Sequence, residues 1–296
     1  MKSDNLKHNN CLICNNQSLK ALKGYEKDYL VKCNNCGFVF SEKIPTKQEI
    51  SNVYDGYGRN DYLSPITIKR YNELLDKFEK YRKTNNILDI GCGIGYFLEQ
   101  AKKRGWNVYG TEYSDKSVAI CREKGINIFK GSITDSDYSP EMFDVLTSFE
   151  VIEHINNPLQ EIPIYKKILR KGGLFYLTTP NFNSLERYFL KEKYNAIAYP
   201  EHLSYYTPKT IKYLFTNNNF DKIKIETTGI SLSRIKMSKG VSSEQAISPN
   251  SSDEKMREAM EESKLLSLVK LIVNKLLTVF GVGNSLKASF VNKINK

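Results

Sequence analysis

The sequence predicts an α/β protein built on a doubly wound, mostly parallel sheet, with a small metal-binding unit in front of it. Apolar runs alternate five times with helical patterns over residues 86–179, and the first run ends in a turn with glycine at alternate positions, 91, 93 and 95. Alternation of this kind builds a parallel sheet whose ligands bind at the carboxyl ends of the strands. Two Cys-x-x-Cys motifs before residue 40 predict the small unit.

Size and composition are those of a globular chain. The 296 residues are 40% hydrophobic, which suits one large domain with appendages. The net charge of +11 either favours an acidic partner, such as nucleic acid, anionic lipid or a phosphorylated small molecule, or is only a basic surface. Because the first ten residues are polar and no apolar run reaches the ~20 residues of a membrane span, we expect a cytoplasmic protein.

Residues 1–45 are expected to form a four-cysteine zinc ribbon. Cys11 and Cys14 make the first knuckle, Cys33 and Cys36 make the second, and the residues between can form a hairpin. Four thiolates complete a tetrahedral zinc site and leave no open position, so the ion should be structural. Folding of so small a module should depend on the metal. The alternative is a set of reduced free cysteines.

The next segment, residues 46–63, is a connector rich in Tyr, Asp and Gly, which is either a lid over a ligand or a surface hinge. The core of the fold is expected over residues 64–230. Ser64 and Pro65 are typical of a helix start. In chain order the pattern then predicts strands at about 86–90, 107–112, 126–129, 143–149 and 174–179, with the last intervening helix running from Pro158 to Gly172-Gly173.

The second half of the chain follows the same logic. Residues 180–207 form an insertion above the strand ends, a helix is expected at 208–215, and a sixth strand at about 221–227. The serine-rich residues 231–262 predict a mobile loop or linker. Residues 263–296 are expected to hold an apolar helix at 264–280 and a last strand at 285–291, inserted antiparallel between strands five and six.

Four motifs together resemble class I S-adenosylmethionine-dependent methyltransferases. They are Asp89-Ile-Gly-Cys-Gly-Ile-Gly95, Glu112 in Gly-Thr-Glu-Tyr, Phe149-Glu-Val-Ile-Glu-His-Ile155, and Leu169-Arg-Lys-Gly-Gly173. They are most similar to the subgroup of ubiquinone-pathway O-methyltransferases and methyltransferases of bacterial surface-glycan clusters, and residues 200–208 are similar to the glycan-associated members. The resemblance implies a seven-stranded, Rossmann-like methyltransferase sheet. The Gly-x-Gly-x-Gly turn departs from the G-x-G-x-x-G of dehydrogenases.

A methyl donor, S-adenosylmethionine, is the cofactor that the resemblance implies. Glu112 ends the second strand, where a carboxylate can take both ribose hydroxyls, unless it is only a solvated loop acid. The glycines should shape the pocket for the methionine part, and Asp89 should orient that end. The full set of expected donor-binding residues is Asp89, Gly91, Gly93, Gly95, Glu112, Tyr113, Ser132, Ile133 and Phe149.

The acceptor needs a base or a metal that removes its proton. His202, with Tyr205 and Tyr206 beside it in the insertion, is the base candidate; the alternative is a packing residue. In the ubiquinone-pathway relatives a Glu-x-x-Glu-His cluster binds a magnesium ion that activates a hydroxyl. The matching residues here are Glu150, Glu153 and His154, which could also be an ordinary helical turn. His8, in the polar start of the chain, is expected to have no role.

These observations predict methyl transfer to a hydroxyl of a sugar in a nucleotide- or lipid-linked precursor of polysaccharide biosynthesis. The alternatives are an RNA methyltransferase that uses the ribbon and the basic surface, and a non-catalytic binding module; no DNA partner is expected. The helix at 264–280 is buried against the sheet, forms a homodimer interface, or lies on the inner face of the membrane with its lysines at anionic headgroups. Acceptor identity and the choice of O-, N- or C-methylation stay open.

Overall fold

The structure is a computed structural model that describes residues 6–55, 63–231, 235, 254 and 263–294. Residues 56–62 of the lid or hinge expected at 46–63, and nearly all of the linker expected at 231–262, lie outside the described residues. The first part of the expected connector, residues 46–55, contains helix α1 at Lys47–Asp55.

A mixed seven-stranded sheet forms the centre of the molecule, in the order β10-β11-β8-β7-β4-β5-β6. Strands β8, β7, β4, β5 and β6 run parallel to one another. Strand β11 is antiparallel to both of its neighbours, β8 and β10. The predicted doubly wound sheet, with the last strand inserted antiparallel, is thus confirmed. The strands are β4 (Asn86–Ile90), β5 (Asn107–Glu112), β6 (Asn127–Lys130), β7 (Phe143–Phe149), β8 (Leu169–Pro180), β10 (Phe220–Thr228) and β11 (Ser285–Asn292).

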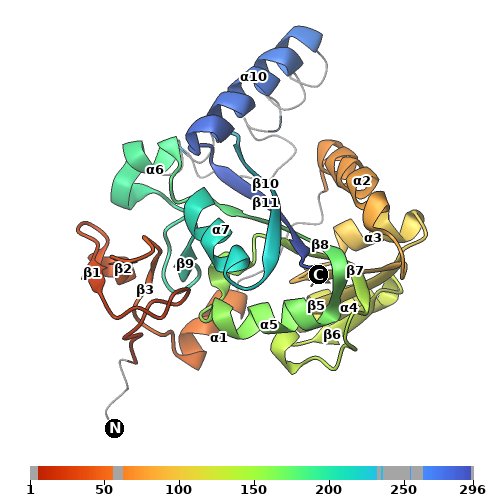
Figure 1. Ribbon diagram of the computed structural model, residues 1–296, viewed down its shortest axis with the longest axis horizontal. Coiled ribbons are helices and arrows are strands. Elements are labelled where there is room, and N and C mark those ends of the chain that lie inside the picture. Colours follow the sequence, from red (N-terminus) through yellow and green to blue (C-terminus); the bar gives the residue numbers. More distant parts are fainter. Residues whose placement is uncertain (1–5, 56–62, 232–234, 236–253, 255–262, 295–296) are drawn as a thin grey trace.

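Helices cover both faces of this sheet (Figure 1). Alternate residues of β4 show the two faces: Ile87 belongs to an apolar cluster with α2 and α3, and Leu88 belongs to a second cluster with α5 and α7. Side chains that alternate along a strand point to opposite faces, so each face has its own core. The principal helices are α2 (Pro65–Phe78), α3 (Tyr96–Lys103), α4 (Asp115–Glu123), α5 (Pro158–Ile168), α6 (Leu185–Leu190), α7 (Pro208–Thr216) and α10 (Lys264–Phe280). Single 3₁₀ turns lie at Glu26–Asp28, Glu79–Tyr81, Ile133–Asp135, Ile152–His154 and Lys191–Lys193.

The boundary between α5 and β8 differs from the expected one. The helix ends at Ile168 and the strand begins at Leu169, so Gly172 and Gly173 lie inside the strand rather than at the helix end. The reason is the close approach of the neighbouring strand β7, because a Cβ on Gly173 would lie 3.0 Å from the carbonyl oxygen of Asp144. The glycine at this position permits the two strands to pack closely. In the sequence alone, the same glycine pair is indistinguishable from a helix stop.

The N-terminal module forms a second, four-stranded antiparallel sheet. Its strands are β1 (Leu19–Ala21), β2 (Leu30–Cys33), β3 (Val39–Ser41) and, from the insertion, β9 (Ser204–Tyr205). Phe38 and Phe40 are fully buried and belong to the same apolar cluster as Leu88 and Phe175 of the large sheet. The module therefore packs into the core of the main domain, next to β9 and α7 (Figure 1).

Candidate functional site

The glycine turn after β4 is left-handed at each of its three glycines, with φ of +66° at Gly91, +54° at Gly93 and +78° at Gly95. A Cβ added to Gly91 would lie 2.6 Å from the Val151 side chain, and one added to Gly95 would lie 2.5 Å from the Ile126 side chain. A Cβ on Gly93 would meet nothing within 4 Å. Packing thus requires glycine at the two outer positions, and the middle one borders open space that a ligand can fill.

These differences predict separable effects for Gly95→Ala and Gly93→Ala. Both place a side chain at positive φ, but only Gly95→Ala also crowds Ile126. We expect Gly95→Ala to lower the free energy of unfolding by about 1–3 kcal/mol more than Gly93→Ala, measured by urea denaturation. Gly93→Ala should instead weaken donor binding. Equal losses of stability would show that the neighbours of Gly95 relax freely.

The carboxylate of Glu112 is fixed beside this turn by backbone groups. Its Oε2 accepts a hydrogen bond from the N–H of Gly93 at 2.9 Å, and its Oε1 accepts from the N–H groups of Tyr113 at 2.8 Å and Ser114 at 3.1 Å. Ser114 in turn caps α4. The acidic side chain at the end of β5 is therefore held in one orientation, at the position where the sequence expects a ribose contact.

The remaining predicted donor residues are distributed along the same edge of the sheet. Asp89 is buried in β4 and accepts a hydrogen bond from Thr147 Oγ1 at 2.7 Å. Phe149 ends β7, with its ring 5.0 Å from that of Phe97. Ser132 caps the turn after β6.

The two other predicted donor residues differ sharply in exposure. Tyr113 is exposed, whereas Ile133 is buried in the apolar core. Two threonines that the sequence analysis missed support the site: Thr147 holds Asp89, and Thr111 Oγ1 accepts from the N–H of Gly91 at 3.3 Å. The one feature of the sequence that could have indicated these threonines is a hydroxyl side chain near the end of a buried strand.

On the predicted acceptor side, Glu153, His154 and His202 meet. A carboxylate oxygen of Glu153 and a ring nitrogen of each histidine all lie within 4.8 Å of one another, and the two rings are 4.8 Å apart at an interplanar angle of 75°. Glu153 and His154 come from the 3₁₀ turn after β7, and His202 comes from the insertion. Val151, which packs against Gly91, connects this turn to the donor side.

Both histidines hydrogen-bond to backbone carbonyl oxygens through Nδ1. Nδ1 of His154 donates to the carbonyl oxygen of Glu201 and Nδ1 of His202 donates to that of Ala196, each at 2.7 Å. In the neutral ring of His202, Nε2 is therefore the acceptor nitrogen. Thr179 Oγ1 donates to Glu153 at 2.9 Å. Burial lowers the pKa of His154, so this imidazole stays neutral below its ordinary titration range.

The magnesium expectation finds little support in this group. Glu150 follows β7 at φ +55° and is not part of the cluster of Glu153, His154 and His202. Two imidazole nitrogens and one carboxylate suit a transition-metal ion, whereas Mg²⁺ prefers oxygen ligands. Magnesium therefore does not fit these three atoms.

The four ribbon cysteines converge as their spacing predicts. Their sulfur atoms all lie within 4.8 Å of one another, and the pairs Cys11–Cys36 and Cys14–Cys33 are each 3.5 Å apart. Sulfur ligands at ~2.3 Å from a tetrahedral Zn²⁺ lie roughly 3.8 Å from each other. All four thiols are free of disulfides, so the cluster fits a structural zinc ion.

The ribbon holds the segment that carries His202. Strand β3 pairs with β9 through Phe40 and Ser204, and the N–H of Ser41 donates to the carbonyl oxygen of Leu203 at 2.9 Å. The N–H of Leu203 then donates to the carbonyl oxygen of Glu153 at 2.8 Å. His202 thus lies at a junction between the ribbon and the turn after β7.

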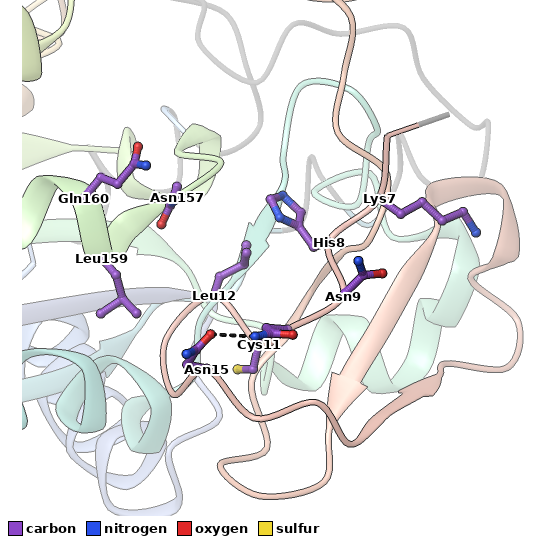
Figure 2. A pocket seen from close by; sticks show the side chains of 10 residues that line it. Lys7, His8, Asn9, Cys11, Leu12, Asn15, Asn157, Leu159 and Gln160 are labelled. Atoms are coloured by element: carbon purple, nitrogen blue, oxygen red, sulfur yellow. Dashed lines mark hydrogen bonds between the residues drawn. The ribbon is translucent and has the colours of Figure 1, made fainter. Parts of the chain in front are cut away.

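His8, which was expected to have no role, contributes to the same junction. Its Nε2 lies 2.6 Å from Asn156 Oδ1, and its ring packs edge-on against Phe40. A hollow of about 620 Å³ lies beside it, between the N-terminal segment and the start of α5. Figure 2 shows residues that line the hollow, with Asn157 and Gln160 across from His8. None of the predicted donor-binding or acceptor-side residues lines this hollow, which marks the seam between ribbon and main domain.

The Rossmann-like methyltransferase folds are defined by a mixed sheet with an antiparallel last strand, a glycine turn after the first strand, and an acidic residue at the end of the second. This protein has all three features, with Glu112 as the acidic residue. Residues 62–225 match the family described as "Methyltransferase domain", more than half of the chain, and the protein belongs to this family of class I S-adenosylmethionine-dependent methyltransferases.

Curated relatives match a shorter part. The ubiquinone biosynthesis O-methyltransferase of Pseudomonas aeruginosa (strain UCBPP-PA14) is 35% identical over 104 residues, which are 33% of this chain and 45% of the relative. Its namesake from Saccharophagus degradans is 28% identical over 128 residues, 41% of this chain and 52% of the relative. The chain thus spans about half the length of the curated relatives that it matches.

Solved structures show the same fold. A SAM-dependent methyltransferase from Archaeoglobus fulgidus has a TM-score of 0.52 at 18% identity, over 76% of this chain and 93% of that one. Phosphoethanolamine N-methyltransferase 2 of Haemonchus contortus, in complex with S-adenosyl-L-methionine, has a TM-score of 0.54 at 20% identity, over 79% and 55%.

Proposed function

We propose that the protein transfers a methyl group from S-adenosylmethionine to a hydroxyl of a small acceptor. The observation that carries the proposal is that one edge of the sheet holds both a donor-type site, with the turn at Gly93 and the fixed carboxylate of Glu112, and an acid–base cluster around His202. Membership of the methyltransferase family supports the donor half.

Different residues would bind the donor and remove the proton of the acceptor. Glu112 would hold the ribose of the donor, while the open space at Gly93 admits its methionine part. As the acceptor oxygen forms its bond to the methyl carbon and the sulfur–carbon bond breaks, Nε2 of His202 would take the hydroxyl proton. The carboxylate of Glu153, held by Thr179, would stabilise the resulting imidazolium.

Two observations suggest the class of acceptor. The curated relatives are named for O-methylation in ubiquinone biosynthesis, which supports an oxygen acceptor and makes a polyprenyl phenol one probe. The motif at residues 200–208 favours a sugar hydroxyl in a nucleotide- or lipid-linked precursor. Because the relatives match over about half their length, the phenol and the sugar are both included as candidate acceptors. RNA is a third candidate, since the chain has a net charge of +11.

Donor binding gives the first test, with Glu112→Ala as the variant. Loss of one charge-assisted hydrogen bond, worth about 1.5–3 kcal/mol, should weaken S-adenosylmethionine binding by roughly 10- to 100-fold in calorimetry. Asp115→Ala, three residues along at the exposed start of α4, is the matched control and should bind normally. Unchanged affinity in Glu112→Ala would contradict the assigned ribose contact.

The acceptor is then identified by S-adenosylhomocysteine release. Purified protein and donor are incubated with nucleotide sugars, lipid-linked sugars, polyprenyl phenols and ribosomal RNA, and the methylated product is located by mass spectrometry. A product methylated on oxygen supports the proposal. Donor binding with methylation of RNA bases alone would overturn it in favour of an RNA methyltransferase, and absence of donor binding would favour a non-catalytic module.

A further inference from the structure

Helix α10 packs on the main domain with its polar side. Asn274 Oδ1 accepts from the N–H of Gly229 at 2.9 Å, and Thr278 Oγ1 donates to the carbonyl oxygen of Thr227 at 2.9 Å. Ser267 and Lys270 lie on the same stripe of the helix and are half-buried. This is the reverse of an ordinary surface helix, which turns its apolar stripe toward the core.

The apolar side of α10 is left facing outward. Ten of its apolar side chains are exposed and only Leu277 is buried. The exposed residues are Leu265, Leu266, Leu268, Val269, Leu271, Ile272, Val273, Leu276, Val279 and Phe280. Figure 1 shows the helix projecting from the sheet edge formed by β10 and β11, with α6 to one side. A contiguous apolar surface of this kind marks an interaction site.

Neighbouring elements extend the apolar surface. A groove of about 480 Å³ between α6 and α10 is lined by Leu185, Val273, Leu276, Leu277, Phe280 and Val282, and by no polar residue. On α6, Phe189 is 83% exposed and Tyr188 is half-exposed. The surface therefore includes aromatic side chains, which favour the boundary between lipid and water.

Lysines border the apolar side of the helix. At ~100° per residue, the exposed apolar positions span an arc of roughly 220°, and Lys264 and Lys275 lie near one border of this arc, between Leu268 and Leu271. No acidic residue occurs in α10. Long lysine side chains in this position can reach anionic headgroups while their stems cover apolar surface.

These features together identify one occupant. We infer that α10 is an in-plane membrane anchor that seats its apolar arc in the interfacial region of an anionic bilayer. A partner helix would cover a narrow stripe, whereas the arc here covers more than half of the helix circumference. Every described helix falls short of what a membrane span requires, and α10 in particular is only ~26 Å long. The inference does not depend on the proposed function.

Vesicle sedimentation of the full-length protein tests the inference. We expect binding to vesicles of phosphatidylglycerol and phosphatidylcholine, and weaker binding to phosphatidylcholine alone. Leu265→Asp with Ile272→Asp should reduce the partition coefficient more than about tenfold, since each change removes an apolar side chain from the buried arc. Ile223→Asp with Ile294→Asp is the matched control, because it places the same two charges at exposed isoleucines outside α10.

Fluorescence locates the contact. Trp106 is the only tryptophan of the chain and is buried, so a Leu268→Trp variant adds one reporter on the arc. Brominated lipids should quench the added emission. Normal donor affinity verifies that each variant is folded. Equal vesicle binding by the two aspartate pairs would overturn the inference, as would a dimer in sedimentation velocity that the α10 pair dissociates without any vesicle binding.

Discussion

Cys33→Ser is expected to abolish methyl transfer and to leave donor binding nearly unchanged. Cys33 is fully buried at the end of β2, and its sulfur lies among the three other ribbon thiols. A zinc ion held by the four thiols would keep only three ligands in this variant and should be lost, and the fold of the ribbon should be lost with it. The ribbon then no longer holds β9 and the preceding Leu203, which hydrogen-bonds to Glu153.

The expected size of the effect follows from this geometry. Displacement of a base by ~1 Å can cost about 100-fold in rate, so kcat should fall by at least that factor. The donor-side contacts of Glu112 and the glycine turn come from elements outside the ribbon and should persist. Calorimetry with S-adenosylmethionine, kcat, and zinc content by mass spectrometry are the three measurements.

Asn34→Ser is the control for this experiment. Asn34 lies in the same knuckle, is exposed, and contributes no sulfur ligand; its side chain donates to Ser18 Oγ at 2.9 Å. It should retain zinc and activity. A Cys33→Ser protein that is free of zinc yet turns over normally would show that the ribbon does not position the acceptor side. Loss of donor binding together with activity would show that the whole domain depends on the ribbon.

The donor side could be predicted from the sequence because its parts are close along the chain. One strand, one glycine turn and the next strand end bring Gly93 and Glu112 together, and strand–helix alternation fixes that these ends share an edge. Only local patterns are needed. Ile133 is the weaker element of the prediction, since its buried side chain belongs to the core rather than to an open site.

The acceptor side depends on contacts that no local pattern reveals. The two-residue strand Ser204–Tyr205 pairs with β3, far away in the chain, and this pairing sets the position of His202. A strand of that length has no recognisable period. The outward apolar side of α10 is a similar case: the sequence shows which residues share a side, but not which side packs on the domain.

His202→Gln is the second decisive variant and is expected to lower kcat by about 100- to 10,000-fold, the usual contribution of a general base. Donor affinity should not change, because His202 lies on the acceptor side and Glu112 keeps its backbone contacts. Gln retains a donor for the carbonyl oxygen of Ala196 but has no basic nitrogen. His8→Gln, a change of the same type at the ribbon seam, is the control and should keep most activity.

The pH profile separates a base from a packing residue. Burial lowers the pKa of His154, so this neighbour stays neutral as the pH falls toward its ordinary value near 6.5. It therefore adds no positive charge that would oppose proton uptake at His202, 4.8 Å away between ring centres. We expect the rate of the native enzyme to fall on the acidic side as the base becomes protonated, and this limb to vanish in His202→Gln. A variant with lower kcat and an unchanged acidic limb would assign His202 to packing and leave the proton to another group.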